Sequence, residues 1–162
     1  MAGITISLDS ANVLAQFKAL EQKTEDMSPA FREVGEILLN NTRDRLADGV
    51  DVDNNAFAPL SSLTKRIKRK NKDKVLIDSG DLYRELTYQL VRGGLEFGSD
   101  RKYAAIHQLG GTIKPVKAKK LAFGGVYANQ VTIPARPFIG FTQKDSAEVL
   151  LALSDHLASA FK

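Results

Sequence analysis

SPAFREVGEILLNNTRDRLADG, residues 28–49, reads as one complete helix from its first residue to its last. Ser28 followed by Pro29 is a strong helix start, because serine can cap the first turn and proline suits the first helical position. One side of the helix is apolar at three- and four-residue steps: Phe31, Val34, Leu38, Thr42 and Leu46. Gly49 then stands where a helix commonly ends. The sequence therefore predicts an amphipathic helix with one face buried in a core.

Two elements are predicted before this helix. Residues 3–8, GITISL, alternate apolar and polar side chains, which is typical of a half-buried strand. Asp9 or Ser10 can then cap a helix that runs to about Gln22. Its apolar positions have helical spacing: Val13 or Leu14, Phe17 and Leu20.

Further elements are predicted after it. Two strand-like runs, TYQLVR and LEFGS, flank Gly93–Gly94, which suits a β-hairpin turn with positive φ at both central residues. Residues 101–109 have the pattern of a short helix that ends at Gly110 and Gly111. Thr142 can cap a last helix, whose predicted apolar stripe is Leu150, Leu153, Leu157 and Phe161.

Two segments lack such a pattern and are predicted to be long loop arms, at about 50–77 and 112–133. The first contains only weak anchors or a short helix. The second has strand-like ends around a Gly124–Gly125 pair, which suggests a long hairpin with a mobile tip. The mixture of helices and hairpins predicts an α+β fold over residues 1–162. We expect a single domain, in which a small, mostly antiparallel, hairpin-built sheet packs with three to four helices.

The charge is unevenly distributed. The net charge of +4 combines a basic pair of segments, 65–74 and 114–120, with a remainder that carries 12 basic and 18 acidic residues. Such clusters are either solvated loops or contacts with an anionic partner, which could be nucleic acid phosphates or an acidic protein surface. The candidate partner-facing residues are Lys65, Arg66, Lys68, Arg69, Lys70, Lys72, Lys74, Lys114, Lys117, Lys119 and Lys120. Any contact with DNA would be non-specific, because no base-reading motif accompanies them.

His107 is the one candidate for catalysis, as a general base beside Tyr103. No carboxylate or nucleophile lies within helical reach to orient or use it, so we expect a histidine packed on Tyr103 and bonded to backbone. An interface role is a second alternative. Cysteine is absent, and no phosphate-binding loop, dinucleotide motif or serine-hydrolase elbow occurs. The sequence thus predicts neither an enzyme, nor a metal site, nor a cofactor.

Targeting signals are also not apparent. The first ten residues lack the pattern of a signal peptide, and the longest apolar run, Val149–Leu153, is too short for a membrane span. We therefore expect a protein made in the cytoplasm that does not contact membrane.

Four short motifs in a fixed order resemble the phage virion morphogenesis family of Mu-like phages and prophages, also described as a tail completion family. They are FAPLS at 57–61 with Thr64, LIDSGDL at 76–82, FGS at 97–99 with YAAIHQLG at 103–110, and IPARPFIG at 133–140. Phe57 stands where many members have tryptophan, and Ser79 stands where threonine is usual. The resemblance covers about residues 1–160.

The resemblance implies a structural tail completion or neck subunit, located in the virion and made in the host cytoplasm. It would form a ring, commonly a hexamer, and contact the head connector or adaptor and the tail terminator or tail tube. The basic arms could then touch DNA phosphates in the channel or acidic neighbouring subunits. The alternative is a cytoplasmic nucleic-acid-binding or assembly-factor protein.

The fourth motif has its own physical rationale. Pro134 and Pro137 fix two φ angles and stiffen the exit from a strand. Arg136 between them can pair with a carboxylate inside the subunit or across an interface, or can simply lie on the surface. Phe138 can enter the core. The expected structural or interface residues are Tyr103, His107, Gly110, Gly111, Pro134, Arg136, Pro137 and Phe138.

Overall fold

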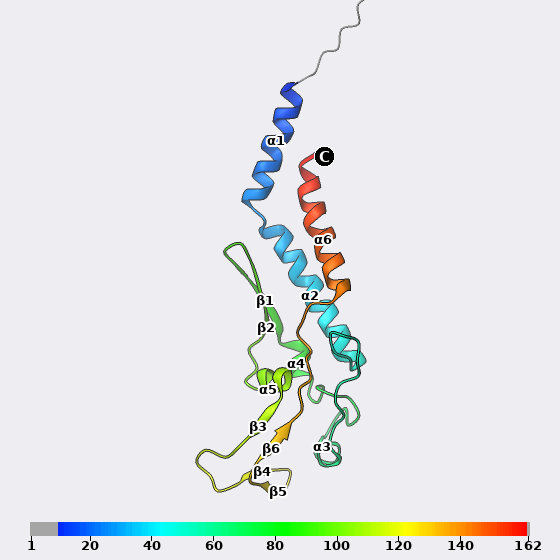
Figure 1. Cartoon of the computed structure of the whole chain (residues 1–162), viewed down its shortest axis with the longest axis vertical. Coiled ribbons are helices and arrows are strands. Elements are labelled where there is room, and N and C mark those ends of the chain that lie inside the picture. The colour runs from blue at the N-terminus through cyan, green and yellow to red at the C-terminus, as the bar shows by residue number, and fades with distance from the viewer. Residues whose placement is uncertain (1–9, 162) are drawn as a thin grey trace, which may run out of the picture.

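The computed structural model describes residues 10–161, and the strand predicted at 3–8 lies outside them. The molecule is elongated (Figure 1). Three long helices gather towards one end: α1 (Ser10–Glu25), α2 (Ser28–Asp48) and α6 (Gln143–Ala158), which continues into a 3₁₀ turn at Ser159–Phe161. Short elements fill the other end: α3 (Ser62–Ile67), α4 (Asp81–Arg84), β1 (Leu86–Val91), β2 (Gly94–Ser99), α5 (Ala104–Leu109), β3 (Gly111–Ile113), β4 (Leu121–Phe123), β5 (Val126–Ala128) and β6 (Val131–Ile133).

The α+β class is confirmed, but the strands do not form one sheet. Within the described residues they form three separate two-stranded antiparallel ladders, β1–β2, β3–β6 and β4–β5. Along the chain, α5 lies between β2 and β3, whereas only loops separate the β3–β6 ladder from the β4–β5 hairpin that it encloses. The helices number six in this part of the chain, more than the three to four expected.

Helix α2 is the centre of the fold, as its sequence predicts. Val34, Leu38, Thr42 and Leu46 are buried, whereas Phe31 is only partly covered. Gly49 ends the helix in the left-handed conformation, φ 77°, and its N–H is bonded to the carbonyl of Arg45. The start differs by one residue: Met27 is the cap position and makes no side-chain cap bond. Asp26 Oδ1 accepts from the N–H of Ser28 instead, at 3.0 Å.

The β1–β2 hairpin packs on α2, and its turn corrects the sequence prediction. Val91 pairs with Gly94, so the two-residue turn is Arg92–Gly93 rather than Gly93–Gly94. Only Gly93 has positive φ, 78°. A turn with a positive φ only at Gly93 fits this sequence, since a positive φ would strain Arg92 and does not strain glycine.

A close approach joins the hairpin to α2. A Cβ atom built on Gly35 would lie 2.5 Å from the ring of Tyr88, so the ring occupies the space of a side chain. Glycine inside a helix costs about 1 kcal/mol relative to alanine, and here that cost allows the tyrosine to lie against the backbone. The Tyr88 hydroxyl donates to Glu36 at 3.0 Å.

The core lies in two clusters along α2. The larger surrounds Phe138 and Leu46. Phe57, Leu82 and Ala104 in this cluster come from the first three motifs, and Leu39 and Leu86 complete it. The smaller joins α2 to α6 through Val34, Leu38 and Ala152, with Leu95 and Phe97 of β2 packed against it. Phe138 is completely buried, as predicted.

Helix α6 begins as predicted but buries a different face. Thr142 and Asp145 form a reciprocal capping box, in which each side chain accepts from the other's backbone N–H. The predicted apolar stripe is wrong in part, because Leu150 and Phe161 are 63% and 53% exposed. The face that meets α2 instead carries the buried Ala152, flanked by Val149 and Leu153.

A buried polar network ties α6 to α2. The carboxylate of Asp145 is fully buried and pairs with Arg45 Nη1 at 3.1 Å. Asn41 Nδ2 donates to Asp145 Oδ1 at 2.7 Å. Burial alone would raise the pKa of Asp145, but the hydrogen bonds from Thr142 and Asn41 and the charge of Arg45 lower it below its usual value. The network thus fixes how the two helices meet.

Candidate functional site

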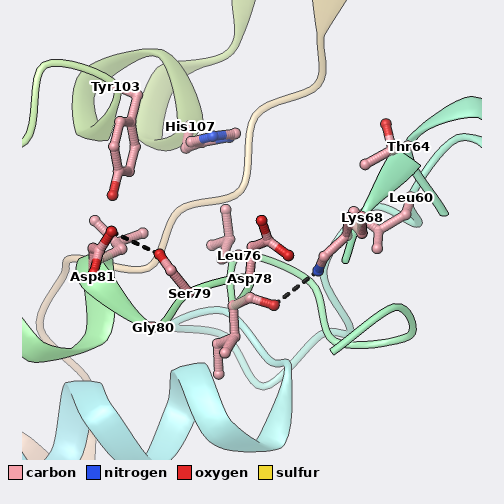
Figure 2. A pocket seen from close by; sticks show the side chains of 12 residues that line it. Leu60, Thr64, Lys68, Leu76, Asp78, Ser79, Gly80, Asp81, Tyr103 and His107 are labelled. Atoms are coloured by element: carbon pink, nitrogen blue, oxygen red, sulfur yellow. Dashed lines mark hydrogen bonds between the residues drawn. The ribbon is translucent and has the colours of Figure 1, made fainter. Parts of the chain in front are cut away.

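Three of the four sequence motifs line one pocket, of about 380 Å³, beside α5 (Figure 2). Leu60 and Thr64 come from the first motif region, residues 76–82 from the second, and Tyr103 and His107 from the third. Leu76 has a left-handed φ of 61°, which is uncommon for a residue with a branched side chain. The fold therefore brings together segments that are far apart in the sequence.

His107 is packed on Tyr103, as predicted, with ring centroids 6.0 Å apart in an edge-on arrangement. The predicted side-chain bond to backbone is wrong: within the described residues, Nδ1 is buried without a hydrogen-bond partner. Burial lowers the pKa of His107, and the nearby charge of Arg136 lowers it further, so the ring is held neutral. The backbone of His107 is what carries a bond, since its carbonyl accepts from Arg136 N–H at 2.7 Å.

Gln108, the neighbour of His107, is the residue that the sequence reasoning missed. Its Oε1 accepts from the N–H groups of Phe138 and Ile139, both at 3.0 Å, and its Nε2 donates to the Ile139 carbonyl at 2.7 Å. One side chain therefore satisfies three backbone groups and clamps the fourth motif onto α5. No local signal in the sequence distinguishes this glutamine, because its partners are about 30 residues away.

Arg136 is not on the surface, and it forms no ion pair with any of residues 10–161. It is 5% exposed, and its guanidinium donates from Nε to the Ala58 carbonyl at 2.8 Å and from Nη2 to the Pro59 carbonyl at 3.0 Å. Burial lowers the pKa of Arg136 from its usual value. The predicted internal carboxylate partner is wrong, whereas an intersubunit partner stays untested. The arginine joins the fourth motif to the first.

Close packing requires glycine at position 110, and Gly111 has a positive φ of 150°. Gly110 has φ 70°, and a Cβ atom there would lie 2.6 Å from the backbone nitrogen of Ala135. A Cβ atom on Gly111 would lie 2.8 Å from Ile106. Pro134 and Pro137 flank Ala135 and Arg136, the part of the fourth motif that lies beside Gly110. The carbonyl of His107 and both glycines thus lie in contact with the root of the second arm, and a structural or interface role for these residues stays a prediction.

The short helix suggested for the first arm and the long hairpin suggested for the second are both present, and the second arm has an additional small hairpin. In the first arm, Ser61 caps α3 by accepting from the Thr64 N–H at 3.1 Å. The second arm forms the β3–β6 ladder at its base and the β4–β5 hairpin at its tip. The tip rests on the first arm, because a Cβ atom on Gly124 would lie 2.5 Å from Ile67 of α3.

Contact between the arms brings the two basic segments to the same end of the molecule, opposite α1 (Figure 1). We call residues 65–74 and 114–120 the basic end. Together they carry eleven lysines and arginines and one acid, Asp73. Asp73 lies 3.8 Å from Lys65, and both side chains are largely in solvent. The basic end therefore has a strong local positive charge on an otherwise acidic subunit.

Lys68 differs from the other cations of the basic end. Its Nζ donates to the carbonyl of Lys74 at 2.6 Å and to the carbonyl of Ile77 at 2.8 Å, and the second of these bonds is drawn in Figure 2. Burial lowers the pKa of Lys68, although Asp78 and Asp73 act in the opposite direction. This ammonium holds its own loop closed. The cations of the basic end that project outwards are Lys65, Arg66, Arg69, Lys70, Lys72, Lys74, Lys114, Lys117, Lys119 and Lys120.

Two further tests concern residues 10–161. No group of three or more His, Asp or Glu side chains there is placed to hold a metal ion. None of the helices in this range is long and apolar enough to cross a membrane.

The comparisons with known proteins agree with the motif pattern. The phage virion morphogenesis family matches residues 8–158. The Mu-like prophage FluMu G protein 2 of Haemophilus influenzae is 32% identical over 87 residues, which cover 54% of each chain. The match thus spans about half the length of that relative. No solved structure matches the chain. Because the family match covers nearly the whole sequence, the chain belongs to the phage virion morphogenesis family.

Proposed function

We propose that the protein is a tail completion or neck subunit, which joins the tail tube to the head connector as a ring around the DNA channel. Membership of the family supports a virion and tail-related role. The observation that carries the finer proposal is the basic end, where eleven cations gather on a subunit whose remaining residues carry a net negative charge. In a ring whose basic ends face the channel, these cations would lie against DNA phosphates.

The rest of the structure fits a scaffold that positions this end. The polar side chains of Arg136 and Gln108 are hydrogen-bonded within the framework that supports the arms, and the two glycines after α5 pack in it. The pocket beside α5 belongs to the same framework. Its Ser79 donates to Asp81 at 2.6 Å, and Asp81 also pairs with Arg84, so these groups are engaged in local structure. The proposed partners are further copies of the chain, the head connector or adaptor, and the tail terminator or tail tube.

Removal of the gene from the phage or prophage tests the proposal. We expect filled heads and finished tails that remain unjoined, and recovery of whole particles when the wild-type gene is supplied in trans. Normal, infectious particles without the gene would contradict the proposal. Arrest before tails are formed would place the protein earlier in tail assembly and would also contradict it.

The contact with DNA can be tested separately on the purified protein. Arg69→Gln, Lys70→Gln and Lys72→Gln together remove three outward cations, so the slope of log affinity for duplex DNA against log salt should fall by roughly 3. The matched control is a triple change of exposed cations outside the basic end: Arg32→Gln, Arg92→Gln and Lys102→Gln. Equal slopes for the two triple variants, or no binding at low salt, would leave an acidic protein surface as the partner of the basic end.

A further inference from the structure

The β1–β2 hairpin has free edges. Within residues 10–161, β2 pairs only with β1, and the pair has six residues in each strand. A two-stranded hairpin is marginal alone, and an unpaired edge presents a row of backbone donors and acceptors to any further strand. One face of the hairpin is already packed on α2 and α6, so a third strand would extend an existing apolar layer.

The two edges differ in what lies beside them. Leu95 and Phe97 of β2 pack in the same cluster as Val149 and Leu153 of α6, whereas no residue of β1 belongs to that cluster. On the β1 side, Tyr88 reaches the carboxylate of Glu36. The edge of β2 is therefore the one whose surroundings suit a strand with an apolar inner face.

The chain itself contains such a segment. Residues 3–8 are six residues long, and Ile4, Ile6 and Leu8 alternate with Thr5 and Ser7. Paired beside β2, the apolar set would face the helices and the polar set would face solvent, because strand side chains alternate between faces.

A second copy is better placed than the same copy to supply this strand to the hairpin. Helix α1 starts at Ser10, with its first turn beyond the hairpin tip, and runs from there towards α2 (Figure 1). Over its 16 residues a helix rises by about 22 Å, whereas the step from Leu8 to Ser10 covers only about 7 Å. To pair with its own β2 edge, the chain would have to turn back at the start of α1 and run beside the whole helix, whereas a second copy needs no such reversal.

The start of α1 also calls for a covering partner. Residues 11–18 are all exposed, and they include Val13, Leu14 and Phe17 on one side of the helix. Phe17 is 63% exposed. A helix of this length is marginal in water without a packed face. This apolar side follows directly after residues 3–8, so one contact with a second copy would cover both.

We propose that residues 3–8 of one copy add as a third strand to the β2 edge of a second copy, and that this exchange links neighbouring subunits. The proposal rests on the self-assembly proposed above and specifies the contact that produces it. Each copy gives a strand at one end and receives one on its hairpin, so the contact is head-to-tail and can close into a ring.

Disulfide cross-linking tests this contact, because the chain has no cysteine of its own. Copies with Thr5→Cys or Ser7→Cys are co-expressed with differently tagged copies carrying Glu96→Cys, then oxidised. We expect a disulfide-linked heterodimer from at least one pair. Gln89→Cys is the matched control, since Gln89 lies directly across from Glu96 on β1 and is also exposed. It would be one strand farther away, beyond the roughly 7 Å between Cα atoms that a disulfide allows.

A second readout uses variants of the segment. Ile6→Lys should reduce the assembled mass to that of a monomer while the circular dichroism and melting temperature stay unchanged, and Ser7→Lys should leave assembly intact. Cross-linking as efficient at Gln89→Cys as at Glu96→Cys, or full assembly by Ile6→Lys, would overturn the proposed contact. An assembled ring that lacks the Glu96 cross-link would reject this contact and leave the ring itself standing. A chain that stays monomeric and is dispensable for joining heads to tails would reject both.

Discussion

Asp145→Ala should be among the most destabilising single substitutions in the body of the protein. The side chain is completely buried and holds Arg45 Nη1, Asn41 Nδ2 and the Thr142 N–H. Alanine would leave a largely buried guanidinium without its carboxylate and would remove half of the capping box. Loss of one partner of a buried pair costs about 3–5 kcal/mol, and that figure includes most of the cap's contribution of about 1 kcal/mol.

This loss would be a large share of a total stability of about 5–15 kcal/mol. For a chain of this length, a change of 1 kcal/mol moves Tm by about 2–4 °C, so we expect a fall of about 10 °C. Thermal melting and urea titration at neutral pH measure it. Asp155→Ala is the control, because this exposed residue lies on the same helix and should change stability by less than about 0.5 kcal/mol.

The pH dependence provides a second check of the same network. Since the folded pKa of Asp145 is lowered, its contribution is present above the unfolded pKa of about 3.9 and is lost as pH falls through the folded pKa. The difference in stability between wild type and Asp145→Ala should therefore shrink in acid. A loss below 1 kcal/mol at neutral pH, or a difference that does not depend on pH below about 4, would refute the buried pair.

Three further outcomes are expected. Gly35→Ala should destabilise the protein in chemical denaturation, despite a helix-propensity gain of about 1 kcal/mol. In a Tyr88→Ala background, which lacks the ring, the same change should be stabilising. A single Gly35→Ala variant that is more stable than wild type would reject the contact. The folded pKa of His107 is lowered, so the contribution of this residue to stability is lost as pH falls below its unfolded pKa of about 6.5. His107→Gln should therefore make Tm depend less on pH between about pH 7 and 5. An unchanged dependence of Tm on pH would show that the ring is solvated. Gly124→Ala should increase hydrogen exchange in α3 more than Gly125→Ala does, since both glycines have positive φ but only the first lies against α3; equal exchange would mean that the arms do not touch.

The parts of the fold that follow local rules could be predicted from the sequence. The buried stripe of α2, the hairpin strands and the Thr142 cap depend on periodicity and on residues a few positions apart. The exposed Leu150 could not be anticipated, because which side of an apolar helix is covered depends on where the neighbouring helix lies. The turn at Arg92–Gly93 shifted by one residue because either glycine could supply the positive φ.

The site was less predictable than the fold. The residue types that hold it were in part identified, but their partners lie far away in the sequence: Arg136 binds carbonyls 77 and 78 residues before it. Such contacts follow from tertiary packing and leave no periodic signal. Likewise, each basic segment was visible in the sequence, whereas their meeting through Gly124 and Ile67 required the structure.

The central claim is that this subunit forms a ring at the joint between head and tail with its basic end towards the DNA. Electron cryo-microscopy of whole particles, with the wild-type particle compared with one that carries a tag at the C-terminus, tests it most directly. The account predicts ring-shaped density for this chain at the joint, with α3 and the 114–120 loop lining the channel. Particles whose joint lacks this chain, or a ring with α1 and α6 lining the channel and the basic end outside, would contradict it.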